Sequence, residues 1–80
     1  MEGRHVGELT DREREILDLE HETWMLAGHK EEAIRVRLNE SPTAYYQQLN
    51  ALLQREEALA YRPMLVSRLR RIAESRRRGA

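Results

Sequence analysis

Histidines and carboxylates are the first side chains in this sequence whose types and spacing could do chemistry. Asp18 and His21 stand three positions apart, so a helix would place them on one face, as in half of a carboxylate–histidine metal site. A metal site in a helical bundle needs several such elements that converge from different helices. We expect His21 and the other two histidines, His5 and His29, to be surface residues. The sequence therefore predicts no metal site and no cofactor.

Nucleophilic catalysis has little support among the remaining candidates. The three serines have no plausible histidine and acid beside them and suit helix caps or the surface, and the chain has no cysteine. Its acidic residues fall on helix faces that water would solvate, where nothing moves a carboxyl pKa toward useful catalysis. The sequence therefore predicts that the chain is not an enzyme, which leaves binding as the function to explain.

The stretch "LNESPTAYYQQLNALL", residues 38–53, contains the side chains best suited to binding. Ser41 followed by Pro42 is a strong helix start, because serine accepts a hydrogen bond from a free N–H and proline fits the first helical position. Gln47 and Gln48 should lie on the open side of that helix. Glutamine can bind adenine through two hydrogen bonds, and Thr43 can donate to a base or a phosphate.

Four helical segments are expected to position these side chains. Thr10 and Glu13 have the spacing of a capping box that opens the first helix, and Gly28 is a natural stop for it. The second helix covers about residues 30–38 and the third about 42–54. Residues 55–63 form a connector with at most one helical turn, and Pro63 opens the last helix.

The apolar stripes of these segments predict an all-α fold, a compact three- to four-helix bundle that contains a helix-turn-helix. We divide the chain into a flexible leader (1–8), the helix-turn-helix domain (9–73) and a basic, frayed tail (74–80). The expected core consists of Ile16, Leu17, Trp24, Ile34, Leu38, Tyr45, Leu49, Leu52, Leu65, Leu69 and Ile72. Of the adjacent tyrosines, one should be buried and the other, Tyr46, exposed, with a hydroxyl that could meet a phosphate.

The charges are unevenly distributed along the chain although the net charge is zero. Residues 1–32 hold ten acids and four bases, whereas residues 33–80 hold four acids and ten bases. A basic half attracts a phosphate backbone, but the two halves could equally pair with each other. No apolar run approaches the roughly 18 residues that a membrane span needs. The first residues are too polar for a secretory signal, so we expect a cytoplasmic protein without membrane contact.

The two middle helices and their short link have the size of a helix-turn-helix, whose second helix enters the major groove of DNA. The same arrangement also occurs in bundles that never touch DNA. On the first interpretation, the helix contacts DNA through Ser41, Thr43, Ala44, Tyr46, Gln47 and Gln48. The phosphates beside it are contacted by Arg35, Arg55, Arg68, Arg70 and Arg71.

Three blocks carry a resemblance to a known family: "LTDREREILDLE", which is followed by a Trp, "EEAIRVRLNESPTAYYQQLNALL" and "EALAYRPMLVSRLRRI". They resemble small actinobacterial proteins that are classed as a domain of unknown function and are predicted to be helix-turn-helix proteins. The resemblance covers residues 9–73. The block 41–53 is also similar to the fourth region of bacterial sigma factors, which binds promoter DNA and RNA polymerase.

Two places depart from the resemblance. Related sequences usually have a glycine and an apolar residue in the turn, where this chain has Asn39 and Glu40. Asn39 can adopt the backbone angle, but Glu40 adds a negative charge near any DNA. Ala44 stands where related sequences usually carry a basic residue on the exposed start of the reading helix. We therefore expect weak DNA binding, or binding helped by a partner.

Two functions stay open on the sequence. The first is a small transcriptional regulator that binds double-stranded DNA. The second is an adaptor that binds RNA polymerase or another transcription protein, without sequence-specific DNA contact, through the acidic first helix or the last helix. The apolar stripe of the last helix, rimmed by arginines, could also join two copies of the chain in a homodimer.

Overall fold

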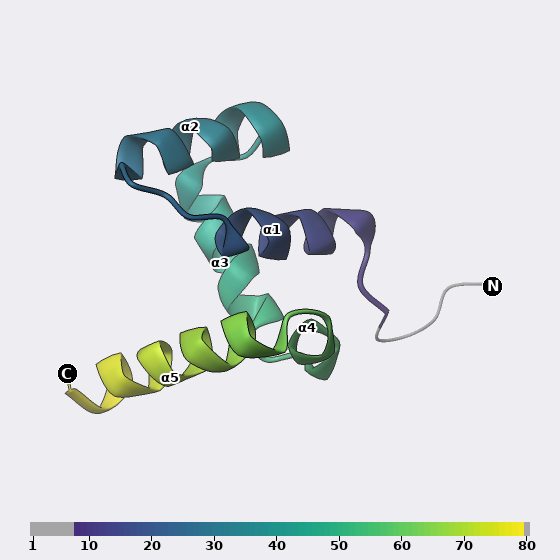
Figure 1. Ribbon diagram of the computed structural model, residues 1–80, viewed down its shortest axis with the longest axis vertical. Coiled ribbons are helices and arrows are strands. Elements are labelled where there is room, and N and C mark those ends of the chain that lie inside the picture. The colour runs from purple at the N-terminus through teal and green to yellow at the C-terminus, as the bar shows by residue number, and fades with distance from the viewer. Residues whose placement is uncertain (1–7, 80) are drawn as a thin grey trace.

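The computed structural model describes residues 8–79, so all but the last residue of the expected leader lies outside the described residues. Five helices occupy the described part of the chain (Figure 1). They are α1 (Asp11–His21), α2 (Ala27–Leu38), α3 (Pro42–Leu52), α4 (Glu56–Tyr61) and α5 (Pro63–Gly79). Residues 8–79 contain no strand, and the predicted all-α fold is confirmed. The connector expected to hold one turn contains α4, which brings the number of helices in this part to five.

The beginning of α1 agrees with the sequence, but its end does not. The Thr10 hydroxyl accepts from the Glu13 N–H at 3.1 Å, and the Glu13 carboxylate accepts from the Thr10 N–H at 2.8 Å, which completes the capping box. The expected stop at Gly28 is wrong, because α1 ends at His21 and Gly28 lies in the first turn of α2. The Leu19 carbonyl accepts the Trp24 indole N–H at 3.0 Å and the Glu22 N–H at 3.2 Å. In a continuing helix, the Leu19 carbonyl would accept from the N–H of the residue four positions later. Because the two donors occupy this carbonyl instead, the helix ends here.

A three-residue turn, 39–41, joins α2 to α3 and produces the predicted helix-turn-helix arrangement. Asn39 has φ 54° and ψ 46°, the left-handed conformation expected of it. The Ser41 hydroxyl accepts from the Ala44 N–H at 3.1 Å, and Pro42 takes the first helical position, as predicted. A cap on one side and a left-handed residue on the other therefore fix the turn.

The core lies where α1, α2 and α3 meet and extends to the start of α5. Eight of the expected core residues are buried: Ile16, Leu17, Ile34, Leu38, Tyr45, Leu49, Leu52 and Leu65. Trp24 and Leu69 are half-buried and pack against this core. Ile72 is 40% exposed, so its expected burial is wrong, and the fully buried Val66 was absent from the expected core.

In Figure 1, α3 runs from α2 at one end of the molecule to α4 and α5 at the other, and α1 crosses it. The Arg70 guanidinium ties α5 to the end of α3 by donating to the carbonyls of Leu53 (2.6 Å) and Arg55 (3.2 Å). Beyond this contact α5 projects from the bundle (Figure 1). The residues expected to form a frayed tail continue this helix as far as Gly79.

Candidate nucleic-acid interface

The outer face of α3 is an open stripe of uncharged polar side chains. It consists of Thr43, Gln47, Asn50 and, just after the helix, Gln54, all of which are exposed. We call these four residues the polar stripe. Successive helical residues point about 100° apart, so residues three or four apart share a face. Asn50 and Gln54 were not among the residues predicted to contact DNA, although their spacing from Gln47 could have identified them.

The opposite face of α3 packs against α1 through a buried tyrosine. Tyr45 has no exposed surface, and its hydroxyl lies 2.7 Å from the Glu20 carboxylate and 3.3 Å from the Ile16 carbonyl. Burial and then the adjacent Glu20 carboxylate raise the pKa of the Tyr45 phenol well above its usual value. Tyr45 therefore holds the polar stripe outward, which confirms that one of the paired tyrosines is buried.

Tyr46 lies at one edge of the polar stripe and is 38% exposed. Its ring packs edge-on against Tyr45, with centroids 5.0 Å apart, and the Lys30 ammonium lies 5.0 Å from its centroid. Lys30 also forms an ion pair with Glu20 at 2.8 Å. Burial lowers the pKa of Lys30, but hydrogen bonds with Glu20 and Tyr46 outweigh this effect and raise it. A positive charge thus stands beside Tyr46, whose contact with a phosphate stays a prediction.

The other edge of the polar stripe is held to the turn. Gln48 is half-buried, and its amide donates to the Glu40 carboxylate at 2.9 Å. The Arg12 guanidinium donates to the same oxygen at 2.8 Å. Hydrogen bonds from Gln48 and then from Arg12 hold the pKa of Glu40 below its usual value. The acid in the turn is therefore balanced by Arg12, and the Gln48 amide is less available than that of Gln47.

The remaining residues predicted to contact DNA have different surroundings. Ala44 is half-buried, and the exposed Ser41 caps α3. Arg55 pairs with Glu13 at 2.8 Å, and Arg70 is bound to the two carbonyls described above.

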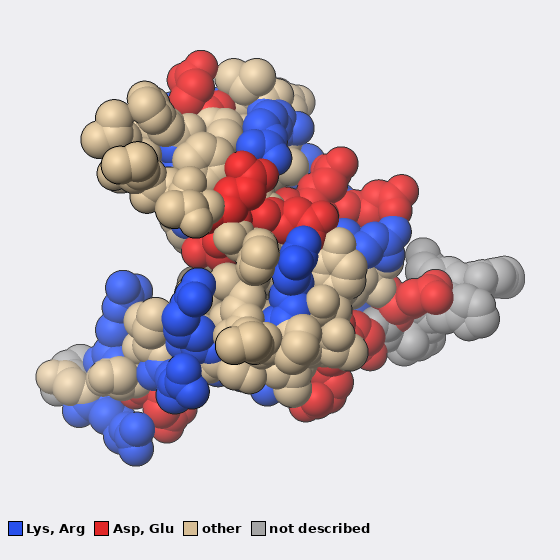
Figure 2. Space-filling model, in the orientation of Figure 1, with Lys and Arg blue, Asp and Glu red and all other residues tan. Residues whose placement is uncertain are grey.

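Within residues 8–79 six arginines form no ion pair, and one of them, the half-buried Arg70, is held by those carbonyls. The other five are exposed: Arg35, Arg68, Arg71, Arg76 and Arg78. Four of the five lie on α5. Figure 2 shows basic side chains gathered over the projecting end of that helix and acidic side chains over α1.

The chain matches, over residues 8–79, the model of a family described as "Protein of unknown function (DUF3263)". It belongs to this family. Comparison with curated proteins gave no match, and comparison with solved structures gave none. The match confirms the expected resemblance to a domain of unknown function. The actinobacterial source and the likeness to sigma factors stay predictions.

Two other kinds of site can be considered in this DUF3263 protein. No group of three or more histidine or acidic side chains lies together to hold a metal ion in the part of the chain that the structure describes. None of its described helices is long and apolar enough to cross a membrane. The polar stripe, with charges at both edges, can donate and accept hydrogen bonds along one helix face. Such a face can recognise another molecule by hydrogen-bonding to its exposed donors and acceptors.

Proposed function

We propose that this DUF3263 protein binds double-stranded DNA, with α3 in the major groove, and acts as a small transcriptional regulator in the cytoplasm. The observation that carries the proposal is the polar stripe, which stays open to solvent while Tyr45 and its neighbours brace the helix from behind. A major groove admits one α-helix, and its base edges present donors and acceptors that amide side chains match. The turn at 39–41 places this helix as the second of a helix-turn-helix pair.

The proposal assigns base contacts to Thr43, Gln47 and Asn50, since they share the outermost face of α3. The stripe has no positive charge, so attraction to phosphates must come from arginines outside it. Arg35 on α2 and the unpaired arginines of α5 are available for this role. Affinity that depends on few arginines should be modest and should fall as salt is added, because bound counterions are released on binding.

The proposal is tested by fluorescence anisotropy titrations against a set of genomic fragments at two salt concentrations. We expect binding at low salt that weakens at high salt, and a changed sequence preference in the Gln47→Ala and Asn50→Ala variants. Gln48→Ala is the matched control, because this glutamine is already bound by Glu40 and should alter the preference less. Absence of DNA binding by the unaltered chain at low salt would refute the proposal.

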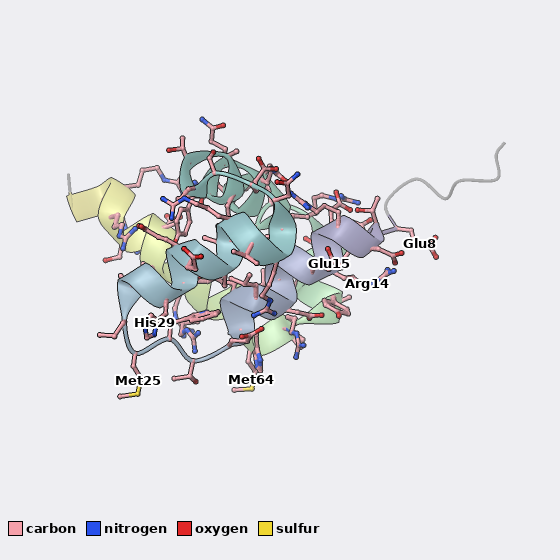
Figure 3. All side chains as sticks on the ribbon, turned by 90° about the horizontal axis from the view of Figure 1, so that it is seen from above. Glu8, Arg14, Glu15, Met25, His29 and Met64 are labelled. Atoms are coloured by element: carbon pink, nitrogen blue, oxygen red, sulfur yellow. The ribbon has the colours of Figure 1, made fainter. Side chains whose placement is uncertain are left out.

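A protein-binding adaptor is the second candidate, and exposed methionines favour it. Met25 is 92% exposed and Met64 is 86% exposed. Figure 3 places both on one side of the molecule, away from α3. Methionine suits adaptable contacts with other proteins. RNA polymerase, another transcription protein or a second copy of the chain would be the partner. Affinity capture after nuclease treatment should then recover one dominant protein, and Met64→Ser should abolish that recovery without affecting DNA binding.

A further inference from the structure

Resting on the proposed DNA binding, we infer that the projecting end of α5 is a second contact with the same DNA. In particular, we assign Arg76 to the phosphate backbone of the strand that would pass along the Tyr46 edge of the polar stripe. This contact deepens the proposed site, because it identifies which strand is held and by which charge. From the sequence, the residues around Arg76 were expected to form a frayed tail.

The first step of the argument is that packing does not account for the end of α5. Leu69 is the last α5 side chain that packs against the core, and every residue from 71 to 79 is exposed. Apart from the partly covered Ile72, this segment buries little, so it gains little from tertiary structure. The Glu74–Arg77 pair at 3.0 Å and arginines near a helix C-terminus give modest local support. The core thus leaves the concentration of arginines there unexplained.

The second step is the position of this segment beside α3. Arg76 and Asn50 line the same two surface hollows, of about 290 and 440 Å³. Tyr46 lines the first hollow and Gln54 the second. Arg76 therefore borders the polar stripe along its second half, from the side where Tyr46 and Lys30 lie.

The third step is the direction and freedom of the arginines. Residues two apart on a helix point about 200° apart, so Arg78 points away from the side that Arg76 occupies. The hollows beside α3 are lined by Arg76 and not by Arg78. Arg77 reaches them but is paired with Glu74. Arg76 is thus the α5 arginine that both faces the stripe and, within the described residues, forms no ion pair.

Charge complementarity identifies the partner as a polyanion. Among the described residues that line the hollow at the Tyr46 edge, Lys30 and Glu20 pair with each other at 2.8 Å, and Arg76 adds a positive charge with no acid beside it in that lining. At the opposite edge, Glu40 and Glu13 face their own arginines and leave no surplus of positive charge. A phosphate strand is therefore attracted along one edge of α3 and not the other, so the two DNA strands should be held unequally.

The test compares Arg76→Gln with Arg78→Gln in the full chain, using a duplex that the unaltered protein binds. Both changes remove one charge from the last turns of the same helix, so effects on overall charge and on the helix dipole are matched. We expect Arg76→Gln to reduce the slope of log K against log salt by about 0.9, the value for one phosphate contact. Arg78→Gln should change the slope by less than half as much.

Two further readouts keep the outcomes distinct. Circular dichroism and the thermal midpoint should be the same in both variants, since neither side chain is buried. Hydroxyl-radical footprinting should show protection lost from one strand in Arg76→Gln. Equal effects of the two substitutions, or equal loss of protection on both strands, would overturn the assignment of Arg76 while leaving DNA binding intact. If the unaltered chain does not bind DNA, the proposed function itself fails. Binding of Arg76 to an acidic peptide in place of DNA would overturn the inference as well.

Discussion

Replacing Tyr45 by phenylalanine should test how α3 is held in place. The substitution keeps the buried ring and removes only the hydroxyl that bonds Glu20 at 2.7 Å. A hydrogen bond to a charged group contributes about 1.5–3 kcal/mol to stability. The Glu20 side chain is 12% exposed and keeps its ion pair with Lys30, so the loss should lie near the lower end, at about 1.5–2 kcal/mol.

This loss is large relative to the total free energy of unfolding that so small a domain can have. For a domain of this size, 1 kcal/mol shifts the thermal midpoint by roughly 4–8 °C, so Tyr45→Phe should lower it by roughly 6–16 °C. Urea unfolding followed by circular dichroism should give a lower midpoint with an unchanged m-value, because the surface exposed on unfolding stays the same.

The control is Tyr46→Phe, which removes the same hydroxyl from the adjacent exposed tyrosine and should change the unfolding free energy by less than about 0.5 kcal/mol. A double-mutant cycle of Tyr45→Phe with Glu20→Gln should give a coupling of at least about 1 kcal/mol. A Tyr45→Phe variant as stable as the unaltered chain would show that the hydroxyl does not brace α3, and that the leucines alone set the orientation of the polar stripe.

The remaining predictions concern pH, the turn and the core. Because the folded state raises the pKa of Tyr45, its contribution to stability is complete below about pH 10 and is lost as the pH rises further; thermal midpoints should fall there, and less steeply in Tyr45→Phe. At Asn39, with φ 54°, substitution by alanine should cost about 1 kcal/mol and by glycine less than about 0.5 kcal/mol, measured by urea unfolding. Val66→Ala should cost about 1.6 kcal/mol or more for two buried methyl groups, and Ile72→Ala less despite the larger truncation, as differential scanning calorimetry would show.

The parts of the fold that were predictable depend on partners close in sequence. The capping box at Thr10 and the Ser41 cap each join groups three residues apart, so residue type and spacing are sufficient to identify them. The end of α1 depends instead on an aromatic side chain that turns back. The Trp24 indole donates to the Leu19 carbonyl, and an apolar pattern treats Trp24 only as a core anchor. Gly28 was consequently predicted to stop a helix that had already ended.

The last helix shows a second limit of apolar patterns. The spacing of Leu65, Leu69 and Ile72 predicts one continuous buried stripe, but a periodic sequence does not tell where the neighbouring helices end. Helix α5 extends past them, so Ile72 is partly exposed. Helix α4 packs against α5, and Val66 is buried beside Leu65 near the start of α5. The same extension turns a predicted tail into the helical segment that borders the polar stripe.

Charge shows why the candidate site was harder to predict than the fold. The sequence left open whether the acidic and basic halves pair, and the structure shows that they do so in part. Two carboxylates of α1 pair with Arg55 and Arg62, and Glu22, just after α1, pairs with Arg37; all three arginines are far from their partners in sequence. A count of basic residues therefore overestimates the number of positive charges that are available to contact DNA phosphates.

The five exposed arginines without an ion pair set the scale of electrostatic DNA binding by the fold as it stands. If each met one phosphate, the slope of log K against log salt would reach about −4.5, at about −0.9 for each contact. Arg78 points away from α3, so the observed slope should be shallower. A steeper slope would require a phosphate contact from a cation that is bound within the protein, such as Lys30, Arg70 or an arginine of an ion pair. Each such contact would break an interaction seen within the protein, so a slope steeper than about −4.5 predicts that at least one of these interactions is lost on DNA.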